Sequence, residues 1–387
     1  MSVQKKIKVL TIIGARPQII KAAALSRAIK NNFEKEIQEI IIHTGQHYDP
    51  AMSQVFFDEL SIPPPDYNLN TGSGSHGKQT ASMIEGIEAV LITEKPNCIV
   101  LYGDTNSTLA GAIAASKIQV PVIHIEAGLR SFNKSMPEEI NRIMCDHVST
   151  LLFSPTKSGY DNLLKEGFKE NDQPPYSFDN PKIYHCGDVM YDNSLYFSSL
   201  AEQKTKVLEN NNLQQNNFIL ATIHRNNNTD DPLRLNALFG VMNKIAAENK
   251  IKIILPLHPR TLKLLPQNLT PELYNTVQTN QYLKIIPPVS FLEMIALEKN
   301  ATMIMTDSGG VQKEAFFFQK PCIILRSETE WIELVKCGSA RIADADETKI
   351  LEAFDHYSAA KDLTFPDLFG DGNAAEFICG EILKHIK

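Results

Sequence analysis

The sequence lacks the cysteine and histidine spacings that mark zinc sites and disulfide frameworks. None of the six cysteines in the 387-residue chain stands in a CxxC spacing, and the ten histidines form neither HExxH nor HxH. Most of the cysteines lie in apolar context, as small core residues do. We therefore expect free thiols and no metal cofactor bound by a local motif.

A basic block and a long apolar run are also missing. The formal net charge is −7, and this argues against nucleic acid as a partner. Gly14 and Arg16 interrupt the apolar run near the N-terminus too early for a signal peptide or a membrane span, and no later run is long enough. We expect a cytoplasmic protein that does not bind membranes.

Short apolar runs alternate with longer amphipathic segments along the chain. The runs predict strands at 7–13, 39–43, 98–102, 122–125, 150–153 and 183–185, and then at 218–223, 252–255, 283–286, 303–306, 322–325 and 340–342. Helices are expected between them, for example at 18–30, 76–92, 108–116, 137–148, 233–249 and 347–357. This alternation is typical of parallel sheets covered by helices on both faces.

Two sets of about six strands predict an α/β protein with two Rossmann-like, doubly wound parallel-sheet domains that face each other across a cleft. The chain length also favours two domains. We expect the first domain at 1–190 and the second at 191–371, with a last helix at 372–387 that packs back on the first. Ligands of such sheets bind at the carboxyl ends of the strands.

The clearest anion-binding pattern is a strand, a tight turn and a helix around Ser308, Gly309 and Gly310. Such a turn points backbone N–H groups and the positive end of a helix dipole at a ligand, and two glycines allow a phosphate to approach closely. Glu314, about one turn further on, is placed to accept hydrogen bonds from sugar hydroxyls. An ordinary Asp307 or Ser308 helix cap would explain the same residues.

Charged and polar side chains follow the predicted strands of the first domain. They are Arg16 and Lys21, Gln46 and His47, Asp104, Glu126, and Glu138 with Arg142. The two cations near the first helix start suit an anionic ligand. The three carboxylates at one sheet edge suit acid–base chemistry, because partial burial tunes their pKa values. Taken singly, each also has a structural explanation: Asp104 as a helix cap, and one of Glu138 and Glu139 as a helix-dipole partner.

The second domain offers a different set of groups at its strand ends. They are His224 and Arg225, His258, Phe291, the turn of Ser308, Gly309 and Gly310, and Arg326. Hydroxyl, glycine and cationic groups suit the binding of a diphosphate. We therefore expect the second domain to hold the ligand and the first to move protons.

Eight motifs in this order resemble the non-hydrolysing UDP-N-acetylglucosamine 2-epimerase family. They are GARPQIIK from 14, TGQH from 44, GDTNST from 103, HIEAGLRS from 124, PEEINR from 137, HR from 224, TDSGGVQKEA from 306 and LRSETEW from 325. The resemblance covers about residues 7–335. It implies a glycosyltransferase-B-type fold, a homodimer, a UDP-sugar substrate, and no nicotinamide or metal cofactor.

The resemblance also implies a reaction and residue roles. C2 of the sugar is inverted by elimination of UDP to a glycal and its re-addition, a step toward cell-surface polysaccharide precursors. By motif position, Asp104, Glu126 and Glu138 resemble the acid–base carboxylates. The other implied contacts are the following: Arg16, Lys21 and His224 at the diphosphate and active centre, Ser308, Gly309 and Gly310 as phosphate cradle, Glu314 at the ribose, Arg326 on the nucleotide side, and Gln46, His47, Arg142 and Arg225 in the cleft.

Three positions depart from the pattern of one bacterial branch. Gln18 and Asn227 stand where Glu is common, and Trp331 stands where Arg is common. GARPQ, PEEINR and GDVMYD also resemble relatives acting on UDP-2,3-diacetamido-glucuronic acid. The substrate, and a regulatory second substrate site known in some members, therefore stay open. Two further functions compete with epimerisation: a glycosyltransferase of the same fold and a sugar-binding protein without catalysis.

Overall fold

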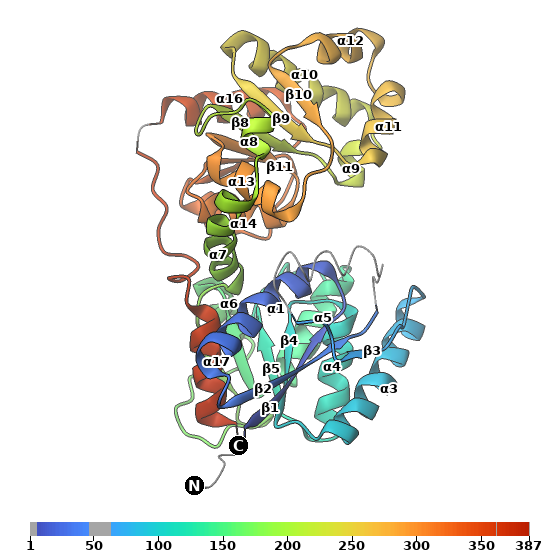
Figure 1. Ribbon diagram of the computed structural model, residues 1–387, viewed down its shortest axis with the longest axis vertical. Helices are drawn as coiled ribbons and strands as arrows, with labels where there is room; N and C mark the ends of the chain where they lie inside the picture. The colour runs from blue at the N-terminus through green and yellow to red at the C-terminus, as the bar shows by residue number, and fades with distance from the viewer. Residues whose placement is uncertain (1–5, 46–62, 361, 387) are drawn as a thin grey trace. The chain divides into compact units, whose positions relative to one another are not determined.

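The computed structural model describes residues 6–45, 63–360 and 362–386, and the chain separates into two compact units (Figure 1). Unit 1 comprises Met1–Asn193 and Asp367–Lys387, and unit 2 comprises Ser194–Pro366. Helix α7 (Val189–Lys204) carries the chain from one to the other. Each unit is built around its own parallel sheet.

Unit 1 contains a seven-stranded sheet with the order β3-β2-β1-β4-β5-β6-β7, and all of its pairings are parallel. The strands are β1 (Ile7–Ile13), β2 (Ile37–His43), β3 (Tyr67–Asn68), β4 (Cys98–Tyr102), β5 (Val122–Ile125), β6 (Leu151–Ser154) and β7 (Lys182–His185). The central strands β4 and β5 are buried along their whole length. They are apolar on both faces because helices cover both.

The helices of unit 1 are α1 (Arg16–Ala28), which continues as a π-helical turn (Ile29–Phe33), α3 (His76–Glu94), α4 (Asn106–Lys117), α5 (Pro137–His147), α6 (Lys157–Lys165) and α17 (Ala374–His385). Helix α4 is rich in alanine and packs tightly between its neighbours α3 and α5. The C-terminal helix α17 lies beside α1 (Figure 1). Asn32 Nδ2 donates a hydrogen bond to Glu376 Oε1 at 2.6 Å there.

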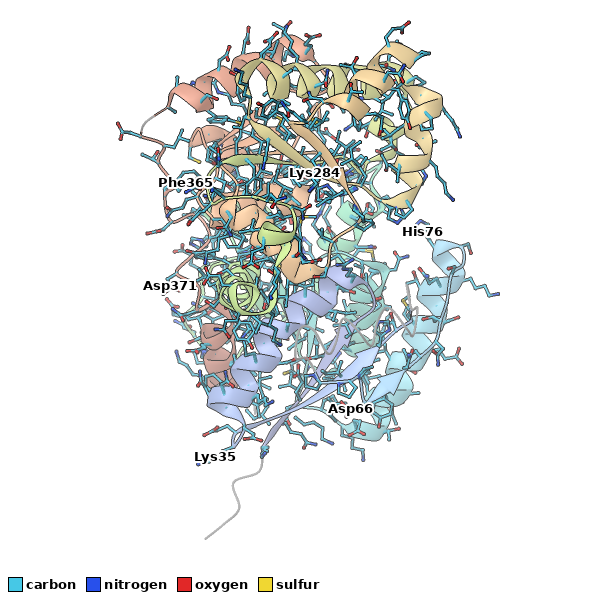
Figure 2. All side chains as sticks on the ribbon, turned by 45° about the horizontal axis from the view of Figure 1, so that its top comes forward. Lys35, Asp66, His76, Lys284, Phe365 and Asp371 are labelled. Atoms are coloured by element: carbon cyan, nitrogen blue, oxygen red, sulfur yellow. The ribbon has the colours of Figure 1, made fainter. Side chains whose placement is uncertain are left out.

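Unit 2 contains a six-stranded parallel sheet with the order β10-β9-β8-β11-β12-β13. The strands are β8 (Phe218–Thr222), β9 (Lys252–Pro256), β10 (Leu283–Ile286), β11 (Met303–Thr306), β12 (Cys322–Ile324) and β13 (Ala340–Ile342). The helices are α8 (Val207–Asn210), α9 (Asn226–Thr229), α10 (Pro232–Asn249), α11 (Pro259–Asn268), α12 (Pro271–Thr279), α13 (Phe291–Asn300), α14 (Gly309–Phe317), α15 (Ile332–Lys336) and α16 (Glu347–Ala359). Phe365, in the segment after α16 (Figure 2), packs against Phe316 of α14 with ring centroids 5.5 Å apart.

The predicted α/β class is confirmed, and both sheets are doubly wound around a central pair of strands, β1 with β4 and β8 with β11. The two-residue strand β3 was not predicted, because it has no apolar run of its own. It is held by Asp66, labelled in Figure 2, whose carboxylate accepts a hydrogen bond from Ile41 N at 2.8 Å. Within the described ranges no helix is both long and apolar enough for a membrane span, and all six cysteines are free thiols.

Candidate active site

Two neighbouring strands of unit 1 carry carboxylates just beyond their ends. β4 leads through Gly103 into Asp104, and β5 leads into Glu126. The Nζ of Lys21, on α1, forms an ion pair with Glu126, and only 15% and 7% of the two side chains are exposed. The carboxyl ends of parallel strands therefore bring residues more than 100 positions apart into contact.

Gly103 is required by this ion pair. Its φ of +63° lies in the left-handed region, which favours glycine. A Cβ atom at this position would lie 3.1 Å from both Glu126 Oε2 and Lys21 Nζ. Gly103, the first residue of the GDTNST motif, thus leaves room for Lys21 and Glu126 to form their ion pair.

Asp104 belongs to the same cluster and is not the helix cap. Thr105 is the N-cap of α4, where its side chain accepts a hydrogen bond from Thr108 N. Burial raises the pKa of Asp104; the positive charges of Lys21 and Arg142 oppose that rise, and the negative charges of Glu126 and Glu138 add to it. The three predicted carboxylates therefore lie close enough to influence one another.

Glu138 and Glu139, adjacent at the start of α5, have different environments. Glu139 is buried and accepts hydrogen bonds from Ser131 N at 2.9 Å, from Phe132 N at 2.9 Å and from the guanidinium of Arg142. Burial alone would raise the pKa of Glu139, but the bonds from Ser131 and Arg142 lower it overall. Glu139 is thus the structural member of the pair, and Glu138 is exposed.

Arg142 connects Glu139, the structural carboxylate, to Asp104, the candidate catalytic carboxylate. Its Nη1 lies 2.5 Å from Asp104 Oδ2, and its Nη2 lies 2.9 Å from Glu139 Oε2. Asn141, the preceding residue, donates from Nδ2 to Asp104 O at 2.8 Å. Helix α5 therefore fixes both the backbone and the carboxylate of Asp104.

A buried ionic network lies behind Glu126, and its acidic member was not predicted. His124 is fully buried; its Nδ1 lies 2.6 Å from Asp146 Oδ1 and its Nε2 lies 2.8 Å from Gly103 O. Asp146 also accepts from Gly128 N at 3.1 Å and pairs with Arg130 at 2.7 Å. These bonds hold the backbone on both sides of Glu126, whose φ is +71°.

Both ring nitrogens of His124 face hydrogen-bond acceptors, an arrangement that suits an imidazolium. Burial lowers its pKa, but neighbouring Cys145 and Asp146 raise it well above the ordinary value. Both ring nitrogens can then donate, one to the Asp146 carboxylate and one to the Gly103 carbonyl. His124, expected as a satisfied core histidine, supports two candidate site residues through their backbone.

The remaining predicted residues of unit 1 have separate environments. Arg16 is exposed at the first residue of α1. Gln46 and His47 lie outside the described residues. Gln18, one of the departures, is buried; its Oε1 accepts from Gly14 N at 2.9 Å, and its Nε2 donates to Tyr102 O at 3.0 Å. A glutamate could not donate the second bond, so Gln18 ties the β1–α1 turn to the end of β4.

In unit 2, Asp307 organises two strand ends. The buried carboxylate accepts hydrogen bonds from His224 N at 3.0 Å, from Arg225 N at 3.0 Å and from Asn228 Nδ2 at 3.0 Å. It therefore joins the end of β8 to the end of β11, its neighbour in the sheet. Asp307 was expected only as a helix cap, and its role depends on residues about 80 positions away.

The start of α14 has the features of an anion site. Ser308 is the N-cap residue, but its side chain makes no capping hydrogen bond. A Cβ atom on Gly309 would lie 3.2 Å from Glu330 Oε2, and one on Gly310 would meet nothing closer than 3.9 Å. Because the Ser308 side chain does not cap this helix, its first N–H groups and dipole suit an anionic ligand.

Arg326 and Trp331 support this helix start. Arg326 pairs with Glu330 at 3.0 Å. Trp331, another departure, donates from Nε1 to Gly309 O at 3.0 Å, and the Nζ of Lys313 lies 4.3 Å from the centroid of the Trp331 ring. Lys313 and Trp331 thus form a cation–π pair that is tied to Gly309 by the Trp331 hydrogen bond.

The other predicted residues of unit 2 are distributed around the sheet edge. Desolvation lowers the pKa of His224; the charge of Asp307 raises it and that of His258 lowers it. His258 is the N-cap of α11 and accepts from Arg260 N at 3.2 Å. Phe291 packs edge-on against Phe197 with centroids 5.2 Å apart. Glu314 lies about one turn into α14 and is half-buried.

No group of three or more His, Cys, Asp or Glu side chains in the described part of the chain could hold a metal ion. The residues of unit 1 can accept and donate protons, and the start of α14 in unit 2 can bind an anion. Two parallel-sheet α/β units of this kind define the glycosyltransferase-B-type class of folds.

The chain belongs to the UDP-N-acetylglucosamine 2-epimerase family, whose sequence profile matches residues 29–383. It is 47% identical to a UDP-N-acetylglucosamine 2-epimerase homolog from Methanococcus maripaludis, over 98% of this chain and 100% of the relative. It is 46% identical to the UDP-2,3-diacetamido-2,3-dideoxy-D-glucuronate 2-epimerase of Pseudomonas aeruginosa, over 97% and 99%.

A solved structure of the same family matches the whole fold. The Methanocaldococcus jannaschii UDP-GlcNAc 2-epimerase in complex with UDP-GlcNAc and UDP is 41% identical, with a TM-score of 0.81 and coverage of 98% of this chain and 100% of that one. The family resemblance expected from the eight motifs is therefore confirmed.

Proposed function

We propose that the protein interconverts UDP-N-acetylglucosamine and UDP-N-acetylmannosamine without hydrolysis. The observation that carries this proposal is the cluster of Asp104, Glu126 and Glu138 in a chain of this family. Inversion at C2 needs one group to remove a proton and one to deliver a proton to the opposite face. Several carboxylates that influence one another's ionisation meet that need.

The reaction begins when a carboxylate takes the C2 proton. The C–H electron pair forms the C1=C2 double bond of a glycal, while the C1–O bond breaks and its electrons leave with UDP. UDP then adds back to C1 as another acid protonates C2 on the other face. The raised pKa of Asp104 suits a group that exchanges protons near neutral pH.

The leaving group carries negative charge throughout the reaction. The N-terminus of α14, with Ser308, Gly309 and Gly310, is proposed to bind the diphosphate, with Arg326 nearby on the nucleotide side. Glu314 is proposed to accept hydrogen bonds from the ribose. The remaining predicted contacts, Arg16, Lys21, Gln46, His47, Arg142, His224, Arg225, His258 and Phe291, are proposed to line the substrate site.

We also propose a homodimer. Helix α5 exposes 38% of Ile140 and 44% of Met144, four residues apart on one face. Such an apolar strip suits burial against a second copy of the chain. Analytical ultracentrifugation is expected to give a dimer that Ile140→Lys weakens; a monomeric wild type would contradict this.

The decisive assay uses UDP-N-acetylglucosamine alone, followed by chromatography of the products. Appearance of the manno epimer without an acceptor sugar supports the proposal. No conversion would contradict it, and the Pseudomonas aeruginosa relative then specifies the next substrate, UDP-2,3-diacetamido-2,3-dideoxyglucuronate. Transfer that requires an added acceptor would instead identify a glycosyltransferase.

A further inference from the structure

Glu298 of α13 is an unusual residue for the interior of unit 2. Its side chain is fully buried, and neither carboxylate oxygen has a hydrogen-bond partner that donates to it among the described residues. An ionised carboxylate is strongly disfavoured in such surroundings, because it loses its hydration and gains nothing in return. A leucine or methionine would fill the same position without that cost.

The carboxyl group next to Glu298 is that of Glu314. Helices α13 and α14 pack together, and the two carboxyls lie within hydrogen-bonding reach. Two ionised carboxylates cannot bond, since both are acceptors only. A single proton placed on Glu298 turns the same contact into an O–H···O hydrogen bond. Burial, together with the charge of Glu314, raises the pKa of Glu298 well above its ordinary value.

The two members of the pair differ in access to solvent. Glu298 is completely enclosed, whereas Glu314 is half-buried and lies about one turn beyond Ser308, Gly309 and Gly310. Protonation therefore falls on the enclosed residue, and the negative charge falls on the one nearer the ligand. A protonated Glu298 can donate to the Glu314 carboxylate, which can also accept from a ligand hydroxyl.

We propose that Glu298 is a positioning residue for nucleoside recognition. As a neutral carboxylic acid it donates a hydrogen bond to Glu314 and fixes the carboxylate that accepts from the ribose hydroxyls. This inference rests on the proposed UDP-sugar function. Glu298 itself touches no substrate and acts only through Glu314.

The test compares two substitutions of similar size. Glu298→Gln keeps a donor for Glu314, and Glu298→Met removes it while filling the space. Isothermal titration with UDP and with 2′,3′-dideoxy-UDP separates ribose recognition from phosphate binding. For Glu298→Met we expect UDP affinity and KM to worsen about tenfold, kcat to stay within about twofold, and most of the preference for UDP over the dideoxy analogue to disappear.

Glu298→Gln is expected to bind UDP within about threefold of the wild type and to keep the preference for ribose. Equal affinity and preference in Glu298→Met and wild type would overturn the proposal. So would a Glu298→Gln variant as weak as Glu298→Met, because a hydrogen-bond donor at this position would then not restore UDP binding.

A spectroscopic test needs no ligand. Infrared spectra of the wild type should contain the C=O band of a protonated carboxylic acid near neutral pH, and the difference spectrum between the wild type and Glu298→Gln should show that part of this band is lost. Glu293→Gln, on the same helix, is the control that should retain the band. If the wild type has no such band, the inference is wrong even where the variants fold poorly. If the wild type shows the band but binds no UDP, the proposed function fails instead.

Discussion

Each unit uses the carboxyl ends of its own parallel strands, but the two units use them in different ways. In unit 1 the ends of the neighbouring strands β4 and β5 present carboxylates, and a buried network of His124, Asp146 and Arg130 holds them. In unit 2 the ends of β8 and β11 present backbone groups, and one buried carboxylate, Asp307, holds those. One edge is suited to proton transfer and the other to anion binding, so the two functions should be separable by mutation.

Glu126→Gln should have the largest effect. The amide cannot take or return a proton, so we expect kcat to fall about a thousandfold. Affinity for UDP should stay within about threefold, because the start of α14 and Arg326, which are proposed to bind the diphosphate and the nucleotide, lie in unit 2. Glu85→Gln, on the exposed side of α3, is the control and should leave both quantities unchanged. Equal losses of turnover and UDP affinity would contradict the assignment of proton transfer to unit 1 and anion binding to unit 2.

His124→Asn tests the support of unit 1. Removing the ring breaks its charge-assisted hydrogen bond to Asp146 and leaves Arg130 to balance that buried carboxylate, so we expect a loss of about 2 kcal/mol in the free energy of unfolding. Because the folded-state pKa of His124 is raised, its stabilising contribution is fully present below pH ~6.5 and is lost as the pH rises through the folded-state pKa. The variant should therefore differ from the wild type more at pH 6 than at pH 9.

Urea unfolding followed by circular dichroism measures that difference. The single tryptophan, Trp331, lies in unit 2, so its fluorescence reports the other unit. The fluorescence transition should shift less than the circular dichroism transition. A pH-independent difference between variant and wild type would show that His124 is neutral in the folded protein.

Asp307→Asn tests the support of unit 2. The substitution removes the charge that strengthens three hydrogen bonds at the ends of β8 and β11. We expect UDP affinity to fall about tenfold, while kcat at saturating substrate stays within about threefold. Titration calorimetry and steady-state kinetics measure the two quantities. A fall in kcat with unchanged affinity would reverse the roles that we assign to the two edges.

Trp331→Phe should have the smallest effect. The ring remains to pack against Lys313, but the hydrogen bond to Gly309 O is lost. A single neutral bond contributes about 1 kcal/mol, so we expect a two- to fivefold loss of UDP affinity. Trp331→Leu should lose more, because it also removes the cation–π contact. Equal affinities in all three proteins would show that the tryptophan does not support the helix start.

The fold could be predicted from the sequence because its strands are strongly apolar and its helices amphipathic. The strand Met303–Thr306 and the helix after it, for example, are fixed by a local change of pattern at Asp307. The strand Tyr67–Asn68 could not be predicted, because two residues are too few to show a periodic pattern. Its formation depends on pairing with Ile42 and His43 of β2.

The site was predictable only where a motif marks it. The supporting residues Asp307, Glu139 and Asp146 depend on partners that the fold brings together, and periodicity gives no information about these. The position of Asp146 gave one indication. A negative charge near the C-terminal end of α5 is disfavoured by the helix dipole, which indicates that a cationic partner lies nearby. Asp104 was the candidate cap of the helix after it, whereas the structure has Thr105 as the N-cap of α4.

The central claim is that this chain moves a proton at C2 of a UDP-sugar. Incubation with UDP-N-acetylglucosamine in heavy water, followed by proton NMR, tests it directly. We predict that the C2 proton signal of the gluco sugar is replaced by deuterium while the manno epimer appears, and that Glu126→Gln abolishes both changes. Retention of the C2 proton by the wild type under the same conditions would contradict the account.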